Sequence, residues 1–176
     1  VWMFLIPPLQ TPDELNHLCR AYQLSEGRCR GRNNEQEEKQ GDYLPRSIAL
    51  LATRVGLSRI RFHPDEKLNP DHYVDAFAIP TRHSERVFVE FENTLRYAPT
   101  AYVPQIIAIW LGRALNLPIV VTLLLTRLFA LCTSTLLLYI ALRQIPFLQA
   151  HICLLLLMPM TLQQLLCPGT DALLLS

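Results

Sequence analysis

Apolar residues gather in two long runs near the C-terminal end of the chain. Residues 119–142 form a run of 24 residues with a single charge, Arg127, and residues 147–166 form a run of 20 residues that includes three glutamines and His151. A helix of about 20 apolar residues spans a bilayer core of roughly 30 Å. Because only residues 143–146 separate the runs, the pattern predicts an antiparallel transmembrane hairpin. The alternative is a buried hairpin of a soluble all-α protein.

The polar segment before these runs begins with the signature of a helix start. Residues 11–14 place a threonine at the N-cap, a proline at the first helical position and a glutamate three residues after the cap. Glycine tolerates the left-handed conformation that ends many helices. The helix is therefore predicted to run to about Ser25 and to end near Gly27.

The rest of the polar segment has weaker patterns. Residues 28–42 are charge-rich without apolar periodicity and predict a flexible loop, whereas residues 45–57 have apolar residues at helical spacing. Residues 58–84 are rich in Pro, Asp and His, which favours irregular structure. Residues 87–91 alternate as in an extended strand, and residues 104–116 form an amphipathic stripe with a tryptophan suited to a membrane interface.

Charged residues divide the chain sharply. Residues 7–118 contain 14 Lys or Arg and 14 Asp or Glu, whereas the residues after them contain only Arg127, Arg143 and Asp171. One part is therefore typical of a water-soluble segment and the other of a lipid-soluble one. Nucleic-acid binding needs a clustered positive surface, and this chain has no basic excess to provide it. We expect no nucleic-acid partner.

The division of charge and hydropathy predicts a membrane topology. Arg143 is the only basic residue between the two apolar runs, and the positive-inside rule places such a turn in the cytoplasm. The chain also begins and ends within apolar stretches, so we expect a fragment of a larger polytopic protein. The predicted parts are the end of a transmembrane helix at 1–6, an extracytoplasmic loop with amphipathic helices at 7–118, transmembrane helices at 119–142 and 147–166, and an extracytoplasmic turn with the start of the next helix at 167–176.

Five cysteines add little to this picture. Cys132, Cys153 and Cys167 lie in or near the apolar runs, where a small buried hydrophobe is the ordinary role of the residue. Cys19 and Cys29 lie in the polar segment, where a disulfide could form outside the cytoplasm. The spacing alone does not establish that bond.

Three motifs occur in a fixed order along the chain. The first is Pro-Asp-Glu-x-x-His at 12–17, followed by Arg-Ala-Tyr-Gln-x-Ser-Glu-Gly at 20–27. The second runs from Phe-Glu-Asn-Thr through Tyr-Ala-Pro to Tyr-Val-Pro-Gln within 91–105, and the third joins Met-Pro-Met to Asp-Ala-Leu within 158–173. Together they resemble a family of bacterial polytopic membrane proteins, domain of unknown function 2142. Leu15 stands where that family often has proline.

The layout of that family is similar to GT-C glycosyltransferases, which are integral membrane enzymes. The resemblance implies an all-α integral membrane fold with GT-C-like transmembrane helices and a large first extracytoplasmic loop that contains short helices. It also implies a multi-pass protein of the inner (plasma) membrane. The implied function is transfer of a sugar from a polyprenyl-phosphate donor to a glycan acceptor in cell-envelope polysaccharide assembly. The alternative is a non-enzymatic scaffold or transport component of envelope biogenesis.

The resemblance places an essential acidic residue just after the first spanning helix, where Asp13 and Glu14 stand. We predict Asp13 as the general base, which takes the proton of the acceptor hydroxyl, and Glu14 as the next candidate. Both residues could instead serve only to cap the helix and to favour its dipole. In that helix Asp13, His17 and Arg20 share one face, because they lie at i, i+4 and i+7.

The remaining candidate residues would bind substrate. Arg20 and Arg127 suit phosphate oxygens, because a guanidinium binds them bidentately. His17 could orient Asp13, touch a phosphate or help to bind a metal, and Tyr97 belongs to the second motif. Asp171 is a carboxylate close to lipid, a costly placement that favours a polar cavity. The cofactor is open; a divalent cation such as Mg²⁺ or Mn²⁺ is a candidate, with Asp13, Glu14 and His17 as ligands.

Overall fold

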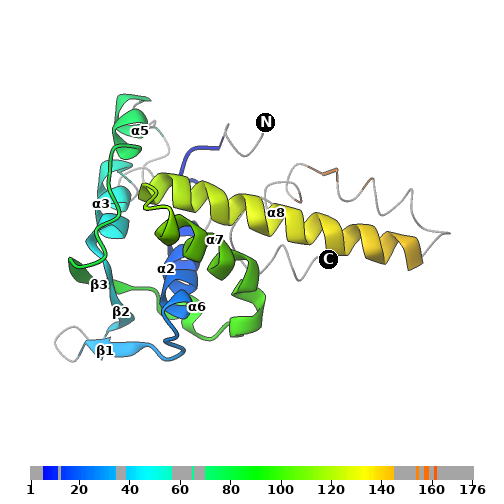
Figure 1. Ribbon diagram of the computed structural model, residues 1–176, viewed down its shortest axis with the longest axis horizontal. Coiled ribbons are helices and arrows are strands. Elements are labelled where there is room, and N and C mark those ends of the chain that lie inside the picture. Colours follow the sequence, from blue (N-terminus) through cyan, green and yellow to red (C-terminus); the bar gives the residue numbers. More distant parts are fainter. Residues whose placement is uncertain are drawn as a thin grey trace.

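A single long helix, α8 (Ile119–Gln144), projects from a folded unit formed by the residues before it (Figure 1). The computed structural model describes residues 6–11, 13–34, 39–56, 65, 70–144, 154, 157, 158 and 161. Apart from those last four positions, the predicted segments at 147–166 and 167–176, with Asp171, lie outside the described residues. Of the predicted segment 1–6, only Ile6 is described.

Short helices make up most of the unit beside α8. The first is α2, at Glu14–Ser25, whose end matches the prediction: Gly27 has a φ of 75° and donates its backbone N–H to Leu24 O. The predicted helix at 45–57 is observed as a shorter one, and the amphipathic segment at 104–116 is helical from Val103. The other helices of the unit are α3 (Arg46–Arg54), α5 (Pro70–Ala76), α6 (Glu92–Leu95), the 3-10 helix η1 (Pro99–Tyr102) and α7 (Val103–Ala114).

A three-stranded antiparallel sheet departs from the predicted all-α class. Its order is β1 (Arg32–Asn34), β2 (Lys39–Pro45) and β3 (Arg86–Glu90). The strand expected at 87–91 is present as β3, but the flexible loop expected at 28–42 is wrong, because β1 and the start of β2 lie there. The buried positions of β2 include Asp42 beside Leu44, so a charge occupies a site where an apolar residue would have revealed the strand.

Glycine permits the close approach of β2 to β3. Gly41 pairs with Glu90 in the register of the two strands. A Cβ atom at Gly41 would lie 2.0 Å from the Val89 carbonyl oxygen, which is a steric overlap. Only a residue without a side chain fits this position.

The hydrophobic core lies where α2 meets α3, α7 and the first turns of α8. Leu18 and Tyr22 of α2 are fully buried there, as are Ile48 and Leu51 of α3 and Leu123 of α8. Burying such side chains stabilises a fold by about 1.5–3 kcal/mol each. The core therefore attaches the polar segment to the base of α8.

Close packing of α7 on α8 depends on a small residue. A Cβ atom at Gly112 would lie 2.7 Å from Oγ1 of Thr122 and 2.9 Å from its Cγ2. Small residues at such crossings allow two helix backbones to approach closely. The contact fixes α7 against the first turns of α8.

The start of α2 differs from the predicted capping box. Asp13, and not Thr11, occupies the N-cap position, and no side-chain hydrogen bond caps the helix. The Thr11 hydroxyl is buried without a hydrogen-bond partner in the described part of the chain. The capping box does not form because the Glu14 carboxylate, which would close it, binds Arg127 of α8 instead.

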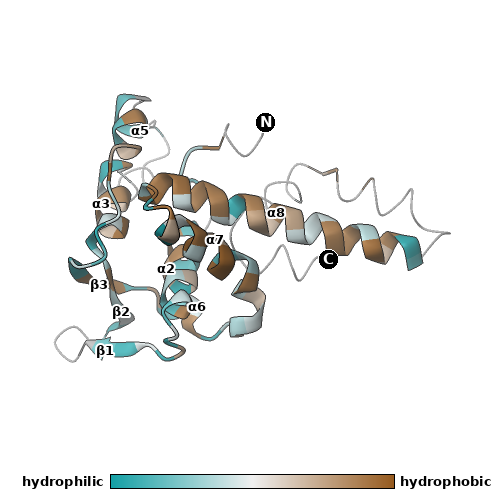
Figure 2. Ribbon diagram, in the orientation of Figure 1, coloured by the Kyte–Doolittle hydropathy of each residue, from teal (hydrophilic) through white to brown (hydrophobic). Residues whose placement is uncertain are grey.

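The two halves of α8 have different surroundings. The first half is buried at positions such as Val120, Thr126 and Ala130, whereas the second half exposes Leu136 and Ile140. Apolar residues nevertheless line the helix along its whole length (Figure 2). Within the described residues, α8 is the one helix whose length and composition would allow it to cross a membrane.

Candidate functional site

A buried ion pair joins the start of α2 to α8. Nε of Arg127 donates to Oε1 of Glu14 at 2.6 Å, and Nη2 donates to Oε2 at 2.8 Å. The two side chains are 1% and 0% exposed. The same guanidinium donates to the carbonyl oxygens of Ile6 at 2.7 Å and Pro7 at 3.0 Å. Both Glu14 oxygens and all three Arg127 nitrogens are engaged in hydrogen bonds. The pair therefore fixes the chain before α2 against α8.

Asp13 lies one residue before Glu14 and is exposed. Its Oδ1 accepts hydrogen bonds from the side-chain amides of Asn16 at 3.4 Å and Asn93 at 3.2 Å. Its backbone has a φ of 55° in the left-handed region, which costs energy for a residue other than glycine. The next residue, Glu14, is buried, so the two adjacent carboxylates have opposite exposures.

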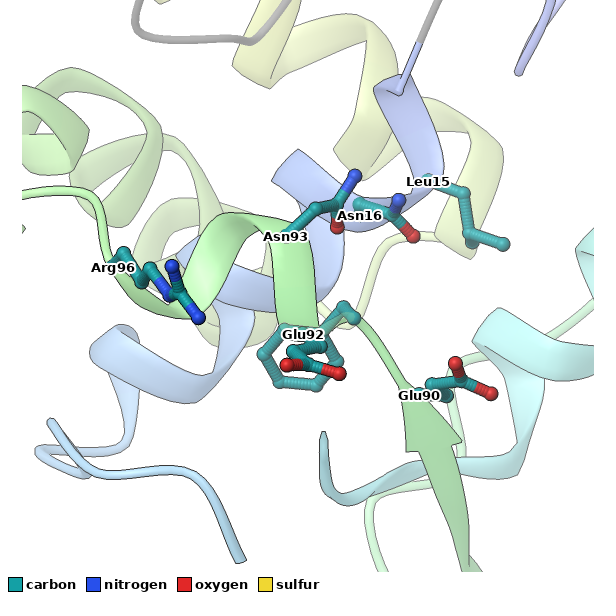
Figure 3. A pocket seen from close by; sticks show the side chains of 7 residues that line it. Leu15, Asn16, Glu90, Glu92, Asn93 and Arg96 are labelled. Atoms are coloured by element: carbon teal, nitrogen blue, oxygen red, sulfur yellow. The ribbon is translucent and has the colours of Figure 1, made fainter. Parts of the chain in front are cut away.

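A polar cavity of about 690 Å³ adjoins Asp13. Asn16 and Asn93, the two amides that bind Asp13, both line it (Figure 3). The other lining residues provide two carboxylates, one guanidinium, an aromatic ring and an aliphatic side chain: Glu90, Glu92, Arg96, Phe91 and Leu15. Carboxylates and amides are donors and acceptors that match hydroxyl groups, and the guanidinium matches an oxyanion.

His17 does not share the exposed environment of Asp13. It is 4% exposed, and its Nδ1 forms a hydrogen bond of 2.8 Å with the Tyr102 hydroxyl. The rings of Tyr97 and Tyr102 lie 5.7 and 5.9 Å from the imidazole. Two of the three predicted metal ligands, His17 and Glu14, are therefore buried in separate protein contacts. Within the described ranges, no three His, Cys, Asp or Glu side chains form a group that could hold a metal ion.

Arg20 is also buried, with only 2% of its surface exposed. Its Nη1 donates to Gln23 Oε1 at 2.6 Å and to the Cys29 carbonyl at 3.0 Å, and its Nη2 reaches the Tyr97 carbonyl at 3.5 Å. Burial lowers the pKa of its guanidinium, whereas Tyr102 and Cys29 oppose that shift. The prediction that one face of α2 presents Asp13, His17 and Arg20 together is wrong, because the core covers the latter two.

The first and second sequence motifs are brought together by these contacts. Asp13 meets Asn93, His17 meets Tyr102, and Arg20 meets the backbone of Tyr97. Tyr97 itself is 39% exposed. The third motif, with Asp171, lies largely outside the described residues.

Both described cysteines of the polar segment are free thiols. Cys19 is buried in α2, and Cys29 is exposed after it. Burial raises the pKa of the Cys19 thiol far above its ordinary value. The disulfide considered from the sequence is absent between these two residues.

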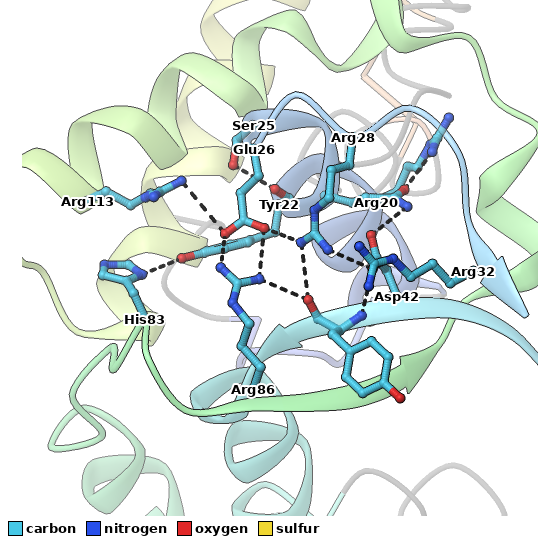
Figure 4. A network of polar contacts seen from close by, with 12 residues as sticks. Arg20, Tyr22, Ser25, Glu26, Arg28, Arg32, Asp42, His83, Arg86 and Arg113 are labelled. Carbon is cyan, nitrogen blue, oxygen red and sulfur yellow. Dashed lines mark hydrogen bonds and ion pairs between the residues drawn. The ribbon is translucent and has the colours of Figure 1, made fainter. Parts of the chain in front are cut away.

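Sequence reasoning missed a network of charges at the other end of α2. Glu26 and Asp42 form ion pairs with arginines that come from separate elements, Arg28 after α2 and Arg86 in β3 (Figure 4). Glu26 belongs to the first sequence motif, so the sequence alone could have marked it as a candidate. Its partner Arg86 lies 60 residues further along the chain, and the two meet because α2 packs beside the sheet.

Comparison with known proteins identifies one family. A family model described as "Predicted membrane protein (DUF2142)" matches residues 1–176. No curated protein matches the chain, and no solved structure matches it. The matched family is the one that the three sequence motifs resemble.

Proposed function

Because the chain belongs to the DUF2142 family of predicted membrane proteins, we propose that it is part of a multi-pass inner-membrane glycosyltransferase. It would use a polyprenyl-phosphate-linked sugar in cell-envelope polysaccharide assembly. The observation on which this proposal rests is the exposed Asp13 carboxylate, held by two amides beside a polar cavity. A polar cavity of this volume suits the sugar head group of such a substrate.

Asp13 is the proposed general base of the reaction. It takes the proton of an acceptor hydroxyl while that oxygen forms a bond to the anomeric carbon of the donor sugar. The bond between the anomeric carbon and the phosphate oxygen breaks, and the polyprenyl phosphate leaves with the electron pair. Asn16 and Asn93 orient the carboxylate by donating to its Oδ1.

The buried contacts suggest other assignments for the remaining residues. Glu14 and Arg127 bind each other, and Arg127 also donates to the carbonyls of Ile6 and Pro7, so we assign neither side chain to the substrate. The two terminal nitrogens of Arg20 likewise donate to protein oxygens. We assign the phosphate contact instead to Arg96, the guanidinium that lines the cavity. The side chains of Glu90 and Glu92 would accept hydrogen bonds from sugar hydroxyls.

A transfer assay with matched carboxylate variants tests the proposal. The full-length protein is reconstituted into vesicles with a panel of polyprenyl-phosphate hexoses and pentoses, and with envelope glycan as acceptor. Asp13→Asn should lower the transfer rate by about 10²–10⁴-fold, the usual contribution of a positioned base. Asp75→Asn, which alters an exposed carboxylate on α5, is the matched control and should keep the wild-type rate.

Two results of that assay would reject the enzymatic assignment. One is full transfer by Asp13→Asn. The other is the absence of transfer from every donor in the panel by a folded wild-type protein, which would favour a scaffold or transport component of envelope assembly.

A further inference from the structure

Four arginines surround a second cavity at the C-terminal end of α2. This cavity has a volume of about 610 Å³. Its arginines come from four different places: the segment after α2, β1, β3 and α7 (Figure 4). The lining residues are Ser25, Glu26, Arg28, Arg32, Tyr43, Arg86 and Arg113.

Two buried carboxylates hold two of these arginines, Arg28 and Arg86, in place. Arg28 donates to Asp42 Oδ1 at 2.7 Å and also pairs with Glu26. Arg86 binds both oxygens of Glu26 and donates to the Tyr43 carbonyl at 3.0 Å. The Asp42 side chain is 0% exposed and that of Glu26 is 9% exposed. The guanidinium groups of Arg28 and Arg86 are therefore fixed before any ligand arrives.

This cluster carries a net positive charge. Four guanidinium groups face two carboxylates, which leaves a formal excess of two positive charges. Burial alone would raise the pKa of Glu26, but hydrogen bonds from Arg86 and Arg28 outweigh it and hold the pKa below its usual value. Glu26 thus stays ionised at neutral pH. The formal excess of two positive charges equals in magnitude the charge of a phosphate monoester.

Two of the four arginines, Arg32 and Arg113, form no hydrogen bond with the two carboxylates. Nε of Arg32 lies 3.6 Å from Asp42, and Nη1 of Arg113 lies 4.0 Å from Glu26, both beyond hydrogen-bonding distance. Their side chains are 60% and 35% exposed. Each guanidinium has five N–H groups in a fork that matches phosphate oxygens. An oxyanion in the cavity could therefore be bound without breaking the Arg28 and Arg86 ion pairs.

An apolar surface continues from the cavity along α7. Trp110 donates its indole N–H to the Ser25 carbonyl at 2.8 Å, and Ser25 lines the cavity. The exposed residues of α7 recur at helical spacing and include one tryptophan, a pattern typical of a helix that lies in a membrane interface. These residues are Val103, Ile107, Trp110 and Leu111, with Leu115 just after the helix.

We propose that this cavity binds the phosphate group of a membrane lipid, with the acyl chains along the exposed face of α7. Arg113 belongs to the same helix as that face, so headgroup and chain contacts would be continuous. The cavity is distinct from the one at Asp13, because the 12 residues of α2 separate them by about 18 Å along the helix axis. A base at Asp13 cannot act on a sugar whose phosphate lies at that distance, so this lipid is not the donor in the transfer reaction.

Calorimetric titration of the full-length protein in neutral detergent tests the proposal. The probes are dihexanoyl phosphatidic acid, inorganic phosphate and dihexanoylglycerol, which separate the whole lipid from its phosphate and its chains. The test variant is Arg32→Gln/Arg113→Gln, which spares the ion pairs that support the fold. The matched control is Arg54→Gln/Arg143→Gln, which removes two exposed arginines elsewhere.

Wild-type and control protein should bind phosphatidic acid, more weakly as salt is added, because screening weakens the charge contacts. The test variant should bind it at least about tenfold more weakly, the change that 1.4 kcal/mol produces. Inorganic phosphate should bind more weakly than the lipid, and dihexanoylglycerol should not bind. Equal lipid affinity of test and control variants would overturn the site, and equal affinity for phosphate and lipid would overturn its lipid character. Neither result depends on the transfer assay with Asp13.

Discussion

Arg127 and Glu14 lie 113 residues apart in the sequence and form a bidentate ion pair that is shielded from solvent. The pair links a helix long enough to cross a membrane with the first residues of the polar segment. The neighbouring residue, Asp13, has a left-handed backbone and an exposed side chain. A structural carboxylate and a proposed reactive one thus occupy adjacent positions.

Replacing one partner of this ion pair should destabilise the protein more than replacing both partners. Glu14→Gln or Arg127→Met leaves a buried charge without its partner, which costs about 3–5 kcal/mol. The double variant Glu14→Gln/Arg127→Met buries no charge and should recover most of that loss. Unfolding by titration with sodium dodecyl sulfate in detergent micelles measures all three. Additive losses in the double variant would show that the two residues do not act as a pair.

The contact between Gly112 and Thr122 should behave as a steric pair. Gly112→Ala places a methyl group within 3 Å of the Thr122 hydroxyl and methyl atoms, so α7 must move away from α8. We expect a loss of about 1–3 kcal/mol of folding free energy. Thr122→Ala removes the two closest atoms, so the double variant should be more stable than Gly112→Ala alone. The same unfolding titration provides the measurement, and a double variant at least as unstable as Gly112→Ala would contradict this packing.

His83 should make the folded state sensitive to acid. Burial, together with the positive charges of Arg113 and Arg86, lowers the pKa of His83 in the folded protein. The unfolded chain, in which a histidine pKa is about 6.5, then binds more protons within the window just below that pH. Stability is therefore fully present above about pH 6.5 and decreases as the pH falls toward the folded pKa.

A comparison of wild type with His83→Gln isolates this effect from the other histidines. The difference in unfolding midpoint between pH 7.5 and pH 5 should be smaller in the variant. Glu26 contributes in a separate window at lower pH, because its pKa is lowered and its contribution is lost as the pH falls through that value. Identical pH dependence of the two proteins would contradict the assignment to His83.

Thiol labelling tests the predicted side of the membrane. Cys29 is exposed, whereas Cys19 is buried and its thiol pKa is raised. In intact cells, a membrane-impermeant maleimide should label a variant that retains Cys29 as its only cysteine, if residues 7–118 lie outside the cytoplasm. A variant that retains only Cys19 should stay unlabelled until it is denatured. Labelling of Cys29 only after the cells are opened would place the segment in the cytoplasm.

The sequence was sufficient for features that depend on local pattern. Helical spacing and a terminal glycine predicted the end of α2 correctly, and apolar length predicted the helix at 119–142, observed as Ile119–Gln144. Alternation predicted β3. These signals are local because each depends on the conformation of only a few consecutive residues.

Features that depend on distant partners could not be predicted in the same way. The capping box at Thr11 fitted its motif, yet the Glu14 carboxylate is bound by Arg127 from another helix. Likewise β2 has a buried charge, Asp42, whose neutralisation requires Arg28. In both cases a long-range ion pair outweighs a local preference worth about 1 kcal/mol.

We propose that Asp13 is the reactive carboxylate and Glu14 the structural one. The most direct test is the rate of sugar transfer per folded molecule for Asp13→Asn and for Glu14→Gln/Arg127→Met, measured in the same vesicles. We predict that folded Asp13→Asn loses transfer by about 10²–10⁴-fold, whereas the folded double variant, which keeps the reactive carboxylate, loses much less. Wild-type transfer by Asp13→Asn, or a folded double variant as inactive as Asp13→Asn, would contradict this assignment.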